Sequence, residues 1–144
     1  MVSRSQQTHS PYLPSQLFQL VADIESYPEF LPWCSAARIL SKDGNVWLAE
    51  LVIHFKAFHE KYTSKVMLDE ETCTIMVEMV SGPFTHLHNH WRFTPAPAGG
   101  TSIDFELDFA FRSVILEKLI GFMFEKACAK MSEAFVKRAQ AIYG

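Results

Sequence analysis

The sequence predicts an α+β fold in which a curved antiparallel sheet wraps around one long C-terminal helix. Residues from about 37 to 111 form β-rich runs separated by short turn signals, which is typical of an antiparallel meander. Residues 102–111 alternate strictly between apolar and polar side chains, the period of a strand with one buried face. From about Ser113 to about Tyr143 the chain keeps helical spacing for roughly eight turns without a proline. Since no other element is long enough to cover the sheet, the helix should pack on it.

The N-terminal part is expected to contain an edge strand, a helix and a short loop. Val2–His9 is polar and weakly alternating, so we expect it to form the edge strand. Pro11 and Pro14 end this strand, and Pro14 suits the first position of a helix. One apolar face of that helix recurs at helical spacing and consists of Leu17, Leu20, Val21 and Ile24. Two further prolines follow, so Tyr27–Trp33 should be a short helical turn plus a loop.

The middle of the chain is expected to be almost entirely strand. The expected strands are Ala37–Leu40, Val46–Phe58, Tyr62–Leu68, Cys73–Val80, Thr85–Phe93 and Ser102–Phe111. Turn residues separate them, among them Lys42-Asp43-Gly44-Asn45 and a charged bend at His59-Glu60-Lys61. Consecutive strands with short connections favour antiparallel neighbours.

The C-terminal helix carries more apolar surface than one interface needs. Its main apolar stripe consists of Leu116, Ile120, Met123, Phe124, Ala127, Met131, Ala134 and Phe135. Ile115, Leu119 and Phe122 lie on the back of this stripe, so the first half of the helix is apolar nearly all round. This second surface could be a membrane or partner patch, a packing site for the Tyr27–Trp33 loop, or a contact between two copies of the chain.

Composition favours a single globular domain over residues 1–144. Hydrophobic residues make up 49% of the 144 positions and charged residues 20%, which argues against disorder. The net charge of −3 provides no basic footprint for nucleic acid, so no direct nucleic-acid partner is expected. Three widely spaced cysteines indicate reduced thiols rather than disulfides or a zinc site. With neither an apolar signal core nor a run of about 20 apolar residues, a cytoplasmic protein is expected, with at most peripheral contact to the inner membrane.

Strand parity separates the side chains that face the core from those that face solvent. Two polar residues, Ser64 and Asn89, share the inward parity of apolar neighbours such as Leu87 and Trp91. A buried amide needs a hydrogen-bond partner. Backbone or bound water could supply it, or these side chains could anchor an oxygen of a ligand.

The same parity places most chemically reactive side chains outside the core. His86, His88 and His90 alternate on the outer face, so we expect solvated side chains there and no metal site. The three acidic residues of 102–111 share that face, and no phosphate loop or nucleophile motif occurs. If a cavity exists, its candidate reactive groups are Tyr62, Ser64 and Asn89.

Several motifs resemble a known family over residues 4 to 142. The segment Asp23–Cys34 reads DIESYPEFLPWC, and Gly82-Pro83-Phe84, Trp91-Arg92-Phe93 and the final strand fit in order and spacing. This pattern is similar to the coenzyme Q-binding START-domain family within the polyketide cyclase/dehydrase-like superfamily. The resemblance implies a START-like helix-grip fold around a lipophilic tunnel. It also implies non-catalytic binding of ubiquinone, held as a ligand and not as a cofactor, in support of respiration and quinone synthesis.

The resemblance also suggests which residues surround the ligand. Tyr27, Phe30, Pro32 and Trp33 would close one end of the tunnel, while the sheet would form one wall and the helix the other. The residues expected to contact the ligand are Tyr27, Phe30, Trp33, Leu51, Ile53, Phe55, Tyr62, Phe84, Asn89, Trp91, Phe105, Leu107, Ile120, Met123, Phe124, Ala127 and Met131.

Three functions are therefore expected, in decreasing order of support. The first is a protein that binds an isoprenoid quinone or a similar lipid and delivers it at a membrane surface. The family also includes bacterial ribosome association toxins, so a translation inhibitor with the ribosome as its partner is the alternative. A small cyclase-type enzyme is the third, and it would need a reactive group inside the cavity.

Overall fold

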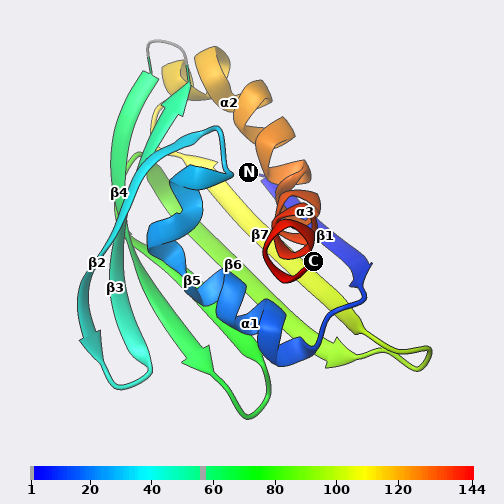
Figure 1. The fold of residues 1–144 in the computed structure, drawn as a ribbon. Helices are drawn as coiled ribbons and strands as arrows, with labels where there is room; N and C mark the ends of the chain where they lie inside the picture. The colour runs from blue at the N-terminus through cyan, green and yellow to red at the C-terminus, as the bar shows by residue number, and fades with distance from the viewer. Residues whose placement is uncertain (1, 56–57) are drawn as a thin grey trace.

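A computed structural model describes residues 2–55 and 58–144 and contains, within them, one seven-stranded antiparallel sheet (Figure 1). The strands lie in the order β1-β7-β6-β5-β4-β3-β2. They span Val2–Ser10 (β1), Cys34–Asp43 (β2), Val46–Phe55 (β3), Phe58–Asp69 (β4), Thr74–Ser81 (β5), Phe84–Pro95 (β6) and Thr101–Phe111 (β7). From β2 to β7 each strand pairs with its neighbour in the chain, and β1 pairs with β7. The antiparallel meander with an N-terminal edge strand is therefore confirmed.

The helices lie on the inner side of the curved sheet (Figure 1). They are α1 (Pro14–Ala22), the 3-10 helix η1 (Ile24–Glu29), α2 (Val114–Ala129) and α3 (Met131–Tyr143). The core forms between them and the sheet, where Phe124 of α2 and Phe135 of α3 join the inward side chains of the strands. The structure thus confirms the α+β helix-grip architecture and the helical turn expected after α1.

The long C-terminal helix is broken, unlike the single helix expected. Lys130 has φ −100° and ψ 5°, and its backbone N–H donates to the carbonyl of Ala127. A straight helix over the whole segment would be about 45 Å long, whereas a strand of eleven residues spans about 36 Å. Bending at Lys130 keeps both halves against the curved sheet. The apolar spacing continues through the break, so it gave no sign of it.

The boundary between the third and fourth strands also differs from the expectation. β3 ends at Phe55, β4 begins at Phe58, and residues 56 and 57 lie outside the described part. His59-Glu60-Lys61, expected as a bend, is regular strand, with His59 paired to His54 and Glu60 to Ile53. These three side chains are exposed, so their charge reflects solvation of the strand and not a turn.

Parity predicted the inward faces correctly. Tyr62, Ser64 and Val66 of β4 are buried, as are Ile103, Phe105, Leu107 and Phe109 of β7. On the outer face, His88 Nδ1 lies 3.8 Å from Glu78, and His90 Nδ1 lies 4.0 Å from Glu106. Within the described residues, no three His, Cys, Asp or Glu side chains gather into a group that could hold a metal ion.

Candidate functional site

A small, partly open cavity of about 60 Å³ lies between the middle of the sheet, the loop around η1 and the start of α3. Its walls come from six elements and one loop. The lining residues are Ile24, Tyr27, Leu31, Trp33, Leu51, Tyr62, Ser64, Val66, Val77, Asn89, Trp91, Met131 and Phe135. Most are apolar, as is usual for sites that bind small apolar molecules.

The loop that follows α1 is held against α3 by aromatic contacts. The ring of Tyr27 meets that of Phe135 edge to face at 5.3 Å, and Phe30 meets Phe135 at 5.0 Å. The Tyr27 hydroxyl donates a hydrogen bond to the carbonyl of Val21. Trp91 of β6 approaches Phe135 from the sheet side at 5.0 Å. Phe135 therefore connects the loop to the sheet across the mouth of the cavity.

Two hydroxyl groups in the cavity wall are available for hydrogen bonds to a ligand. Tyr62 and Ser64 both line it, and neither hydroxyl is hydrogen-bonded to another residue in the described part of the chain. Burial raises the pKa of Tyr62 above its usual range, because the phenolate would lose its hydration. Tyr62 therefore stays protonated at neutral pH and presents an O–H donor.

Asn89 also lines the cavity, but its amide is already engaged. Its Nδ2 donates to the carbonyl of Glu106 at 2.9 Å, and its Oδ1 accepts from the indole N–H of Trp91 at 2.8 Å. Backbone and a neighbouring side chain thus satisfy most of its hydrogen-bonding capacity. The hydroxyls of Tyr62 and Ser64 are better placed than Asn89 to receive a ligand.

The lining offers hydrogen-bond donors and apolar contact, and little acid–base chemistry. Among the described lining residues there is no Asp, Glu, His, Lys or Arg. The nearby thiol of Cys34 is buried, and burial raises its pKa to about 11, so it is a thiol and not a thiolate at neutral pH.

The structure places seven of the expected contact residues in the cavity wall and nine elsewhere. Those that line it are Tyr27, Trp33, Leu51, Tyr62, Asn89, Trp91 and Met131. Those that do not are Phe30, Ile53, Phe84, Phe105, Leu107, Ile120, Met123, Phe124 and Ala127. The side chain of Phe55 lies outside the described residues.

A packed aromatic cluster occupies the end of the core where much of the tunnel was expected. Phe124 meets Phe109 at 4.9 Å, Phe84 at 5.5 Å and Phe111 at 5.7 Å. Phe30 lies on the outer side of the loop, where the guanidinium of Arg138 stacks over its ring at 5.1 Å. The bulky residues of this end fill space that smaller ones would have left open.

Besides Ser64, which was expected only as a possible polar group of a cavity, five lining residues were not among the expected contacts. Val66 and Val77 have the inward parity of their strands, and Phe135 lies on the main helix stripe, so the sequence did carry a signal for them. Ile24 and Leu31 flank the expected lid segment, and their approach to the cavity depends on how that loop folds back over the sheet.

The second apolar surface of the C-terminal helix is exposed in the structure. Val114, Ile115, Leu119 and Phe122 of α2 have between 67% and 70% of their surface exposed. The Tyr27–Trp33 loop packs against Phe135 of α3 instead, so it does not cover these residues. We call the four residues the α2 patch.

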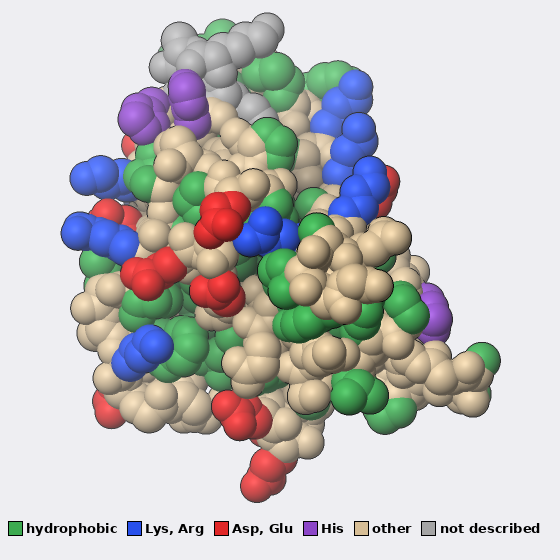
Figure 2. All heavy atoms as spheres, viewed as in Figure 1, with side chains coloured by type: hydrophobic (Ala, Val, Ile, Leu, Met, Phe, Trp, Pro, Cys, Tyr) green, Lys and Arg blue, Asp and Glu red, His purple; other side chains and the backbone are tan. Residues whose placement is uncertain are grey.

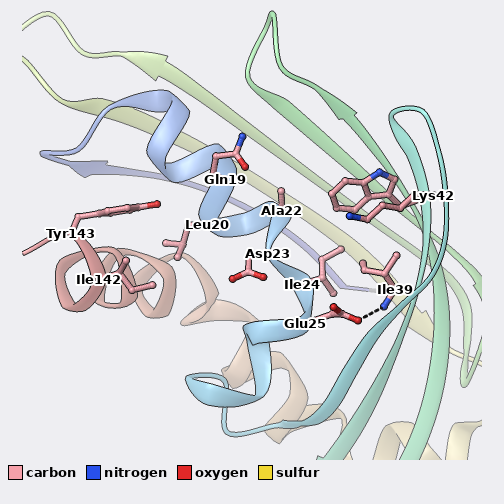
Figure 3. Close-up of a pocket in the computed structure, with 11 residues that line it drawn as sticks. Gln19, Leu20, Ala22, Asp23, Ile24, Glu25, Ile39, Lys42, Ile142 and Tyr143 are labelled. Carbon is pink, nitrogen blue, oxygen red and sulfur yellow. Dashed lines mark hydrogen bonds between the residues drawn. The ribbon is translucent and has the colours of Figure 1, made fainter.

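Larger clefts of about 460 Å³ each open on the surface beside α1. Figure 3 shows one of them, with α1 and η1 on one side and Ile39 and Lys42 of β2 on the other. Its charged groups are used within the chain. Glu25 accepts from the N–H of Ile39 at 3.0 Å, and Lys42 lies 4.3 Å above the ring of Trp47. The candidate site is therefore the small cavity between the sheet, the η1 loop and α3.

Comparison with known proteins agrees with this architecture. The family model described as "Polyketide cyclase / dehydrase and lipid transport" matches residues 10–136. The chain belongs to this family. Within it, the resemblance to the coenzyme Q-binding START-domain group, which includes ribosome association toxins, is confirmed by the relatives below.

Two curated relatives carry different functional names. The ribosome association toxin RatA of Rickettsia prowazekii is 47% identical over 135 residues, which are 92% of this chain and 92% of the toxin. The mitochondrial coenzyme Q-binding protein COQ10 homolog B of Xenopus laevis is 33% identical over 132 residues. That match covers 90% of this chain and 54% of the frog protein.

Solved structures share the fold over nearly the whole chain. An 18 kDa protein of Caulobacter crescentus is 34% identical, with a TM-score of 0.77 and coverage of 100% of this chain and 99% of its own. The Zhui aromatase/cyclase of Streptomyces sp. R1128 has a TM-score of 0.81 and covers 96% of this chain and 93% of its own, at 16% identity. The second likeness shows the fold alone, and since that fold is also found in an enzyme, fold does not decide between binding and catalysis. No helix among the described residues is long and apolar enough to cross a membrane.

Proposed function

We propose that this protein binds an isoprenoid quinone without chemically changing it and delivers it at a membrane surface in the cytoplasm. One observation carries the proposal: two unengaged hydroxyls, of Tyr62 and Ser64, face a cavity whose other lining residues are apolar or aromatic except for Asn89. A quinone has two carbonyl oxygens that accept hydrogen bonds and a tail that is entirely apolar. The coenzyme Q-binding name of the Xenopus relative supports the same ligand class.

The head and the tail of the quinone would be held by different interactions. A hydrogen bond from the Tyr62 or Ser64 hydroxyl to a quinone carbonyl contributes about 0.5–1.5 kcal/mol. Burial of the tail contributes about 25 cal/mol for each Å² of apolar surface removed from water. The tail therefore supplies most of the affinity, while the hydroxyls orient the head.

The cavity must enlarge to accept such a ligand. Its volume of about 60 Å³ is far below the roughly 300–1,000 Å³ of typical ligand pockets. Met131 is the most adaptable lining side chain, and it directly follows the helix break at Lys130. Relative movement of α2 and α3 about this break would shift Met131 and Phe135, the two α3 residues in the cavity wall, and so enlarge the cavity.

Lipid extraction tests the proposal directly. Protein purified from a quinone-producing host is extracted with organic solvent and analysed by mass spectrometry, and near-stoichiometric quinone is the expected result. Empty protein that also fails to take up added short-chain ubiquinone would exclude quinone binding.

Two tyrosine variants test the role of the cavity hydroxyl. Tyr62→Phe keeps the ring and removes the O–H donor, so quinone affinity should fall by about 2- to 12-fold, the equivalent of one hydrogen bond. Tyr12→Phe removes a hydroxyl outside the cavity and serves as the matched control. Equal affinities for the two variants would move the quinone head away from Tyr62.

Ribosome association is the second candidate, and the 47% identical toxin relative favours it. The overall charge of −3 makes ribosomal protein a better contact than ribosomal RNA. Co-sedimentation with purified ribosomes at increasing salt tests this function. Binding that survives moderate salt supports contact with ribosomal protein, and absence of binding at low salt rejects the candidate.

A further inference from the structure

Three residues of the α2 patch form one apolar stripe on the outer side of the helix, and Val114 lies beside its N-terminal end. At 100° per residue, Ile115, Leu119 and Phe122 lie within about 60° of one another. The opposite side of the same helix carries Ile120, Phe124 and Cys128, all buried against the sheet. The stripe is therefore not needed for the core, and the four large apolar side chains of the patch are exposed at positions where small or polar residues would allow the same fold.

Basic side chains lie along one side of this stripe and at its C-terminal end. Lys118, Lys126 and Lys130 are exposed, and the ammonium of Lys126 lies 5.0 Å from the centre of the Phe122 ring. Figure 2, viewed from the same side as Figure 1, shows Lys and Arg side chains gathered in a column along the side of the molecule that α2 occupies. The protein as a whole has a net charge of −3, so this surface is basic although the protein is acidic overall.

The acidic residues of α2 do not offset these lysines at the stripe. Glu125 turns toward the sheet, where its carboxylate accepts from Arg4 of β1 at 2.9 Å. Glu117 lies in the first turn, about 140° around the helix axis from Phe122. An apolar stripe with basic borders is the pattern of helices that lie in the interface of an anionic membrane.

We propose that the α2 patch docks on the surface of an anionic lipid bilayer. Val114, Ile115, Leu119 and Phe122 insert among the acyl chains, and the bordering lysines contact the lipid phosphates. The inference deepens the proposed function, because delivery of a membrane lipid requires contact with the membrane. Docking through α2 also brings the bilayer to the helix whose movement at Lys130 would open the cavity.

Other occupants fit the observations less well. In a symmetric dimer, each copy would present the same lysines to the same seam, and lysine is depleted in protein interfaces. RNA would satisfy the lysines but would leave the four apolar side chains without a partner. A bilayer satisfies both groups at once.

Vesicle co-sedimentation tests the proposal. The full chain is mixed with vesicles of pure phosphatidylcholine, or of equal parts phosphatidylcholine and phosphatidylglycerol. We expect binding to the anionic vesicles, weakening with salt, and at least tenfold weaker binding to the neutral ones. Phe122→Glu should reduce binding to anionic vesicles at least tenfold. Val80→Glu, at a site on β5 that is 59% exposed, is the matched control and should bind as the wild type does.

Defined outcomes would overturn the docking proposal. These are no binding to anionic vesicles, equal binding by the wild type and Phe122→Glu, or equal loss in both glutamate variants. A dimer that Phe122→Glu dissociates, seen by light scattering without vesicle binding, would assign the patch to a second copy. Loss of ribosome binding alone would assign it to the ribosome. Quinone uptake by Phe122→Glu from detergent solution is measured in parallel, so failure of docking and failure of quinone binding remain distinct.

Discussion

At the scale of single residues, the position of Tyr62 depends on a glycine. Gly82 has φ +152°, and a Cβ added there would lie 2.5 Å from the Cβ of Tyr62. No side chain fits this gap without moving the backbone of β4 or of the turn before β6. Gly82 thus holds open the space in which the cavity tyrosine stands.

The Gly82→Ala variant should therefore lose stability and quinone affinity together. We expect its free energy of unfolding to fall by more than about 1 kcal/mol, because strain and a steric clash add. Gly44→Ala is the control: its φ is +60° but nothing lies within 4 Å of an added Cβ, so only the cost of a left-handed residue, about 1 kcal/mol, applies. Urea denaturation measures both. Equal losses in the two variants would show that β4 adapts easily to the extra carbon.

The buried thiols make a second residue-scale prediction, on pH dependence. Burial raises the pKa of Cys34 from 9.0 to about 11, and that of Cys128 to about 12. Between pH 9 and 11 the unfolded chain releases these protons while the folded protein keeps them. The contribution of these thiols to the free energy of unfolding is therefore complete below pH 9. It falls as the pH rises, by about 1.4 kcal/mol per pH unit for each fully shifted group.

Replacement of one thiol isolates its share of this slope. Cys34→Ala should lower stability at every pH because it leaves a small cavity, yet it should flatten the decline between pH 9 and 11. Cys73→Ala controls for loss of a thiol at a half-buried position. Denaturation series across this range supply the slopes, and a slope unchanged in Cys34→Ala would contradict the assignment.

At the scale of elements, α2 depends on its N-cap. The Oγ of Ser113 accepts hydrogen bonds from the N–H groups of Ile115 and Leu116, at 3.2 and 3.4 Å. These are two of the backbone donors that the first turn of a helix leaves without a partner. The cap matters here because this turn carries Val114 and Ile115 of the α2 patch into solvent, with little packing to hold them.

Ser113→Ala should lower the free energy of unfolding by about 1 kcal/mol. Ser113→Asp should retain most of the stability, because its carboxylate can cap the same groups and interacts favourably with the helix dipole. Urea denaturation of the three proteins at neutral pH makes the comparison. If the free energy of unfolding of the aspartate variant is as low as that of the alanine variant, the serine acts through packing and not through its hydrogen bonds.

The elements show where sequence periodicity is informative and where it is not. The alternation from Ile103 to Phe109 predicted the buried face of β7. In a strand with one solvent-exposed face, apolar side chains recur at every second residue. The break at Lys130 escaped prediction, since a bend that preserves apolar spacing leaves no mark on the pattern. His59-Glu60-Lys61 was misinterpreted because charge marks exposure, and an exposed strand end resembles a turn.

At the scale of the whole molecule, the candidate site was only half predictable. Parity identified Tyr62, Ser64 and Asn89 as inward polar groups, yet the position of a cavity along a strand depends on how side chains from other elements fill the space. Phe84 and Phe124 meet each other and close their end of the core, whereas Tyr62 and Trp91 are left facing an open volume. Contacts such as Tyr27 with Phe135, 108 residues apart in the chain, arise only when the fold is complete.

Binding of a ligand in the cavity should raise the melting temperature of the protein. A quinone that binds only the folded state, at 100 times its dissociation constant, adds about 2.7 kcal/mol of stability. For a chain of this size the melting temperature should then rise by about 5–10 °C.

Two comparisons separate the contribution of the quinone head from that of its tail. Tyr62→Phe should need more short-chain ubiquinone than the wild type for the same shift in melting temperature, because the donor to the quinone carbonyl is gone. An isoprenoid hydrocarbon of similar length has no oxygen to accept a hydrogen bond, so it should stabilise the wild type and Tyr62→Phe to a similar extent. If the hydrocarbon shifts the wild type as far as the quinone does, the cavity recognises the tail alone, and Tyr62 and Ser64 have no part in selecting the ligand.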